Sequence, residues 1–142
     1  MQKTNPIPQG KYVTATRFNN VIYTAGMTPR KNGVLIQSGK VTKDADVEIY
    51  REAMCQAADN ALTAAQNKLA EGEKIHQILQ LMVYINAEDG YTQHAKIADL
   101  AVDFLTETLG TAGVAARTSV GVATLPGNAP FEVQMVVAVE GE

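Results

Sequence analysis

Cysteine is almost absent from this chain, because Cys55 is the only one among 142 residues. An intramolecular disulfide and a cysteine-based metal cluster are therefore excluded, and a lone thiol suits a reducing compartment. The two histidines, His76 and His94, are not spaced as paired metal ligands, and no phosphate-binding glycine loop occurs. We expect neither a metal nor a cofactor.

An excess of basic residues is also missing, since 12 Lys and Arg are set against 15 Asp and Glu. Duplex nucleic acid normally requires a concentrated basic face, so nucleic acid is not the expected partner. No segment approaches the roughly 20 apolar residues needed to cross a bilayer. The first twelve residues lack the apolar core of a signal peptide, so we expect a cytoplasmic protein without membrane contact.

What the sequence does contain is a globular composition, with 46% hydrophobic and 19% charged residues. Residues 1–142 are long enough for a single domain with one hydrophobic core. Its hydrophobic periodicity and turn residues predict a β-hairpin over 12–16 and 21–25, a loop over 26–39, a helix between 46 and 72, a strand over 75–87, a helix over 91–109, and strands over 117–124 and 131–139.

This order predicts an α+β fold in which two helices pack on one face of a mixed sheet. One face of the first helix is built of small and apolar residues, which would let it pack close to the sheet: Ile49, Ala53, Ala57, Ala61, Leu62, Ala65 and Leu69. The other face of the sheet would remain open. A second copy of the chain is the expected cover, so we predict a homo-oligomer.

Arg117 is the most informative polar residue, because it opens a strand that is otherwise small and apolar. Its guanidinium offers a fixed fork of donors that matches a carboxylate. The alternative is a surface arginine at a strand end. Glu132, at the start of the last strand, could pair with Arg117 or act in the same site as an acid or base, and the alternative is a simple salt bridge or a solvated carboxylate.

Other candidates are weaker. The turn at Ala25 and Gly26 is small enough for its backbone to approach a ligand closely. Tyr12 and Tyr84 could line a site, although core tyrosines are more common. Cys55 lies among alanines of the first helix, where an inert packed thiol is expected.

Three blocks of the sequence together resemble the RidA/YjgF family. They are Gly-Lys-Tyr-Val at 10–13, Thr-Ala-Gly-Met-Thr-Pro at 24–29, and the segment from Ala-Ala-Arg-Thr-Ser at 115–119 to Phe-Glu-Val at 131–133. The last block is the most specific: Leu-Pro begins eight residues after the arginine, and the glutamate follows six residues after that proline. The resemblance extends from Gly10 to Val139.

The resemblance implies a chorismate-mutase-like fold and a homotrimer with clefts between neighbouring subunits. It also implies a small carboxylate substrate, a reactive 2-imino or enamine acid, which water hydrolyses to a 2-keto acid and ammonia. Arg117 would bind the carboxylate and Glu132 would position or activate the water. The backbone of Ser119 could help to hold that water, while Tyr12, Ala25, Gly26 and Met27 would shape the cleft.

The chain departs from the family pattern at two places. It has Ala25-Gly26-Met27 where the family often has Ser-Gly-Gln, and Ser119 where a cysteine is common. The alternative function is therefore a non-catalytic module that binds a small carboxylate or metabolite in the same cleft. Ribonuclease activity has been attached to parts of the family. This sequence has no basic stripe or series of aromatic residues to bind RNA, and no closely spaced histidine pair to cleave it, so this activity ranks last.

Overall fold

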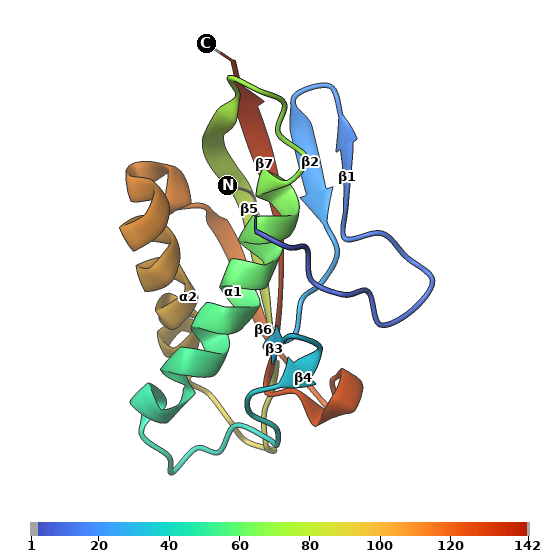
Figure 1. Ribbon diagram of the computed structural model, residues 1–142. Helices are drawn as coiled ribbons and strands as arrows, with labels where there is room; N and C mark the ends of the chain where they lie inside the picture. The colour runs from blue at the N-terminus through green and yellow to red at the C-terminus, as the bar shows by residue number, and fades with distance from the viewer. Residues whose placement is uncertain (1–2, 142) are drawn as a thin grey trace.

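The computed structural model describes residues 3–141 and has a five-stranded sheet with the strand order β1-β2-β7-β5-β6. Figure 1 shows both long helices on the same side of this sheet. The elements are β1 (Ala15–Phe18), β2 (Val21–Thr24), β3 (Arg30–Lys31), β4 (Val34–Leu35), α1 (Arg51–Gln66), β5 (Lys74–Asn86), α2 (His94–Leu109), β6 (Ala116–Val122) and β7 (Phe131–Glu140), with short 3₁₀ turns at Val47–Tyr50, Gly110–Gly113 and Pro126–Asn128. The predicted α+β fold with two helices on one face of a mixed sheet is confirmed.

The central strands explain why the sheet is mixed. β5 pairs antiparallel with β7 and parallel with β6, and α2 makes the crossover that a parallel pair requires. In β7 every second residue from Phe131 to Val139 is at most 6% exposed and faces the helices, so the intervening residues lie on the opposite face. This alternation decides which side chains can form a site.

The predicted first hairpin is present, but its first strand is shifted along the chain. β1 and β2 are joined by Asn19 and Asn20, and Asn19 has a φ of 53°, a conformation that asparagine tolerates well. β1 begins at Ala15 instead of residue 12, because the chain before it bends back in a turn in which the Tyr12 amide donates to the Gly10 carbonyl. Tyr12 is therefore a loop residue.

Helix α1 packs on the sheet through the predicted alanines. Ala53, Ala57, Ala61 and Ala65 are fully buried, and small side chains allow the helix axis to lie close to the strands. Two members of the predicted face lie outside α1: Leu69 follows its end at Gln66, and Ile49 precedes its start and is 57% exposed. The 3₁₀ turn at Val47–Tyr50 has three residues per turn, so its side chains leave the stripe set by the α-helical period, and Tyr50 is buried instead.

No helix in residues 3–141 is long and apolar enough to cross a membrane.

Gly113 provides a test of the packing between α2 and the turn that follows it. A Cβ at this position would lie 2.6 Å from the carbonyl carbon of Leu105, and backbone cannot yield as a flexible side chain can. We expect Gly113→Ala to lower the free energy of unfolding by about 1–3 kcal/mol, as overpacked cores do. Thermal and urea unfolding measure this, with Gly141→Ala as the control because no described residue other than its chain neighbours lies within 4 Å of its Cβ position. Equal stability of the two variants would contradict the packing described.

Candidate functional site

Glu132 occupies the face of the sheet that the helices leave open. Its neighbours in sequence, Phe131 and Val133, are fully buried in the core, so the pleat directs the Glu132 side chain the other way. Met27 exchanges two backbone hydrogen bonds with Val133, at 2.8 and 2.9 Å. This bridge brings the Ala25–Gly26 turn beside the carboxyl group.

A cavity of about 390 Å³ opens in front of this carboxyl group. It brings together four of the residues predicted from the sequence: Tyr12, Ala25, Gly26 and Glu132. The remaining lining residues were not predicted, and they come from the N-terminal segment, the β3 region and the loop before β7: Gln9, Thr28, Arg30 and Pro126. Tyr12 is held in place because its hydroxyl accepts a hydrogen bond from the Gln9 amide at 2.9 Å.

The Glu132 carboxyl group is half-buried, and burial raises its pKa above the usual value of about 4.5. Within residues 3–141 it forms no ion pair that would oppose this shift. Gly26 lies so close that a Cβ there would be 2.8 Å from the carboxyl carbon. A bare backbone therefore forms one wall against the carboxyl group. The expected close approach of this turn to a ligand stays a prediction.

Arg117 and Ser119 lie elsewhere in the same chain. They are on β6, which is separated from β7 by β5, and Arg117 faces the helices. Its Nη1 donates to Oδ1 of Asp99 at 2.7 Å and its Nη2 to the carbonyl oxygen of Ala95 at 3.3 Å. The intrachain pair of Arg117 with Glu132 is thus not formed, because the two side chains lie on opposite faces of the sheet.

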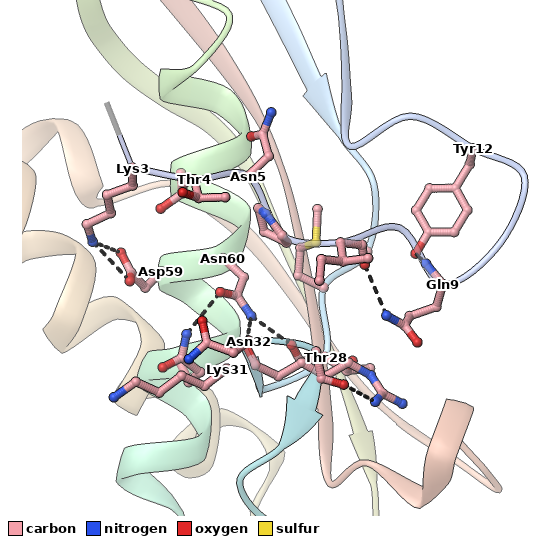
Figure 2. Close-up of a pocket in the computed structure, with 18 residues that line it drawn as sticks. Lys3, Thr4, Asn5, Gln9, Tyr12, Thr28, Lys31, Asn32, Asp59 and Asn60 are labelled. Carbon is pink, nitrogen blue, oxygen red and sulfur yellow. Dashed lines mark hydrogen bonds and ion pairs between the residues drawn. The ribbon is translucent and has the colours of Figure 1, made fainter. Parts of the chain in front are cut away.

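A second cavity, of about 220 Å³, lies between the N-terminal segment, α1 and the β3 region. Figure 2 shows Asp59 and Asn60 on α1 at one side of it and Gln9 and Tyr12 at the other. Lys3 pairs with Asp59 at 2.9 Å and so attaches the N-terminal segment to α1. The cavity excludes Glu132, and Met27, which borders it, is only 5% exposed and packs in the core.

Arg30 is the charged residue among the lining residues that the sequence analysis did not predict. It borders both cavities; its Nη1 donates to the Gly33 carbonyl at 3.0 Å, and its Nε is buried without a hydrogen-bond partner. Leaving a buried donor unsatisfied costs about 1–3 kcal/mol. Asn60, itself 8% exposed, donates to the carbonyls of Arg30 and Thr28 at 2.8 and 3.1 Å and fixes this backbone to α1. The loop context offered no periodicity that would have pointed to Arg30.

The remaining candidates lie outside the larger cavity. The Tyr84 hydroxyl donates to Oε1 of Gln134 at 2.8 Å on the open face of the sheet. Burial raises the pKa of the Cys55 thiol, which keeps it protonated in α1. Among the residues that the structure describes, no group of three or more metal-ligating side chains is placed to hold an ion.

The close approach of Gly26 to Glu132 can be tested by titration. We expect Gly26→Ala to displace the carboxyl group from its present position and expose it to water, so that the pKa of Glu132 falls toward 4.5. NMR titration of the labelled glutamate carboxyl measures the shift. Gly10→Ala is the matched control, because its Cβ would make only ordinary contacts with Tyr12 at 3.5 Å. An unchanged Glu132 pKa in Gly26→Ala would refute the idea that this wall sets its solvation.

Comparison with known proteins places these features in a family. A family model described as Endoribonuclease L-PSP matches residues 2–139. A candidate endoribonuclease from Shewanella oneidensis MR-1 is 26% identical, with a TM-score of 0.85 over 97% of this chain and 91% of the other. The Agrobacterium tumefaciens protein Atu1372, described as of unknown function, is 28% identical, with a TM-score of 0.82 over 97% and 87%. Escherichia coli TdcF with bound serine shares the fold at 22% identity, with a TM-score of 0.66 over 97% of each chain.

Proposed function

Because the chain belongs to the Endoribonuclease L-PSP family, which is the YjgF/RidA family, we propose that it hydrolyses reactive 2-imino or enamine acids to 2-keto acids and ammonia. Family membership by itself supports a function on small molecules or an endoribonuclease-like function. The observation that carries the finer proposal is Glu132, a half-buried carboxyl group that has no ion-pair partner in the described part of the chain and lies beside a bare turn in a cavity of small-molecule size.

The site is completed between subunits of a homotrimer. Arg117 and Glu132 lie on opposite faces of the sheet within one chain, so in this proposal the Arg117 that serves the cavity belongs to a second copy. Strand β6 supports this arrangement because it is an edge strand with a free side for pairing. Phe18, Tyr23 and Val120 are 74%, 49% and 39% exposed on the open face of the sheet, which is apolar area that a neighbouring copy would cover.

The reaction needs one positioned water molecule. Arg117 of one subunit binds the substrate carboxylate, which leaves C2 of the imine in front of Glu132 of the next. Glu132 takes a proton from water while the water oxygen bonds to C2 and the electron pair of the C=N bond moves to nitrogen, and Glu132 then gives this proton to the nitrogen. In the resulting carbinolamine the hydroxyl proton is transferred through Glu132 to the nitrogen, a C=O bond forms as the C–N bond breaks, and ammonia and the 2-keto acid are released with Glu132 again ionised.

Other residues assist in the same scheme. The backbone carbonyl of Ser119 accepts a hydrogen bond from the water, Gly26 lets the substrate approach Glu132, and Tyr12 closes the cavity. Ala25 and Met27 supply no polar side chain to the substrate. Since burial raises its pKa, Glu132 is a stronger base than a solvated glutamate once it is ionised.

The second candidate is a non-catalytic module that binds a small carboxylate in the same cavity. The serine in the structure of TdcF favours ligand binding in this fold, and the absence of polar side chains at Ala25 and Met27 is compatible with binding without turnover. In that case the protein would bind 2-keto acids without accelerating the hydrolysis of imines.

The two functions separate in a coupled assay in which an amino-acid oxidase generates 2-imino acids and release of the 2-keto acid is followed. We expect the native protein to accelerate release, and Arg117→Ala to lower kcat/KM by about 10–100-fold, since hydrogen bonds to a charged group contribute about 1.5–3 kcal/mol. Arg51→Ala is the matched control, because Arg51 also pairs with an aspartate of α2, Asp103. If the protein binds a small carboxylate but does not accelerate imine hydrolysis, the binding module is favoured. If the native protein and Arg51→Ala cleave RNA and Arg117→Ala does not, a ribonuclease is favoured.

The role of Glu132 predicts a pH dependence. The carboxylate is the active form and burial raises its pKa, so activity is present above the raised pKa and lost as the pH falls through it. We expect the acidic limb of kcat/KM to lie above pH 4.5. Glu132→Gln should lack this limb and lose about 10²–10⁴-fold in rate. Rates corrected for spontaneous hydrolysis test this, and an identical limb in the variant would assign the titration to another group.

A further inference from the structure

Arg30 carries a positive charge that no carboxylate within residues 3–141 neutralises. Among residues 3–141, no Asp or Glu forms an ion pair with its guanidinium group. Only Nη1 donates a side-chain hydrogen bond, to the Gly33 carbonyl, while Nε is buried and unsatisfied. The outer edge of the fork therefore retains donors for an anion.

The backbone and the guanidinium group of Arg30 each have a neighbour that restricts them in the wall of the cavity. Asn60 fixes the Arg30 backbone to α1 through the hydrogen bond to its carbonyl. On the other side lies Gly127, in the loop before β7. Its φ is +64°, and a Cβ added at this position would lie 2.7 Å from Nη2 of Arg30. Asn86, which is 1% exposed, donates to the Ala129 carbonyl at 3.0 Å and fixes this loop to β5. Such pre-organisation reduces the entropy lost when a ligand binds.

Arg30 and Glu132 line the same cavity of about 390 Å³ but are not paired. A direct contact would lower the pKa of Glu132, whereas burial raises it, which agrees with a gap between the two groups. Because Glu132 acts at C2 of the substrate and Arg117 of a neighbouring subunit binds the carboxylate next to C2, Arg30 is left to face the side chain of the substrate.

We propose that Arg30 binds a second carboxylate, so that the preferred substrates are 2-imino acids derived from dicarboxylic amino acids. This specificity rests on the proposed deaminase function. The Nη1 and Nη2 groups of a guanidinium can together donate two hydrogen bonds to one carboxylate. A carboxylate loses its hydration when it enters a half-buried site, so it binds there only if such donors replace the lost hydrogen bonds.

The test measures the hydrolysis of two imines that amino-acid oxidases generate in the assay mixture, the imine of aspartate and the imine of leucine. We expect the native protein to favour the imine of aspartate, and Arg30→Gln to lower kcat/KM for it about tenfold or more while the value for the imine of leucine stays within about twofold. Lys31→Gln is the matched control, since Lys31 borders only the smaller cavity. Arg30→Lys, which keeps the charge but not the fork, should lie between. Equal losses on both imines would overturn the inference.

A binding experiment separates this inference from the proposed function. Calorimetry with succinate and with butyrate measures the second carboxylate without any turnover, on protein that circular dichroism shows to be folded. We expect Arg30→Gln to weaken succinate binding about tenfold or more and to leave butyrate binding unchanged. If neither imine is accelerated but this difference is found, the deaminase proposal fails and the Arg30 site stands. Succinate binding that is equal in native protein and Arg30→Gln overturns the Arg30 site, whether or not imines are hydrolysed.

Discussion

The two-residue period of strand β7 is the constraint on which both the core and the site depend. Phe131, Val133 and Met135 fill the space under the helices, and each is at most 1% exposed. Burying such side chains contributes about 1.5–3 kcal/mol each, so the register of β7 cannot slip by one residue without exposing all of them. Glu132 is therefore fixed on the opposite face by the hydrophobic effect acting on its neighbours, and its position requires no polar contact of its own.

Most of the fold could be predicted because the responsible patterns are local. Helix α2, strand β5 and the Asn19–Asn20 turn follow from periodicity and turn residues that any short window contains. Ile49 was placed wrongly on the helix stripe because a 3₁₀ turn and the first turn of an α-helix have similar sequences, and a single turn is too short for the sequence to distinguish their periods.

The site was less predictable because the order of the strands in the sheet, which the sequence does not give directly, decides which residues become neighbours. Arg117 and Glu132 are 15 residues apart and lie at the start of two strands that are consecutive in sequence, which suggests that they are neighbours. In the structure, however, β5 lies between β6 and β7, and the two side chains are on opposite faces of the sheet. Arg30 lies in a segment rich in glycine and proline, where no periodicity assigns a direction to a side chain. Its partners are Gly33 nearby and Asn60, which lies 30 residues further along the chain.

The attachment of the N-terminal segment has a consequence for how this protein can change over evolutionary time. Gln9 and Tyr12 reach the cavity from a stretch that is attached to α1 by polar contacts such as Lys3 with Asp59 and Asn67 with the Lys3 carbonyl. Exposed contacts of this kind contribute little to stability, whereas the wall on β7 is tied to the core. Substitutions in this segment can therefore alter the shape of the cavity almost independently of folding, so that ligand preference can drift between lineages while the sheet and its buried residues stay the same.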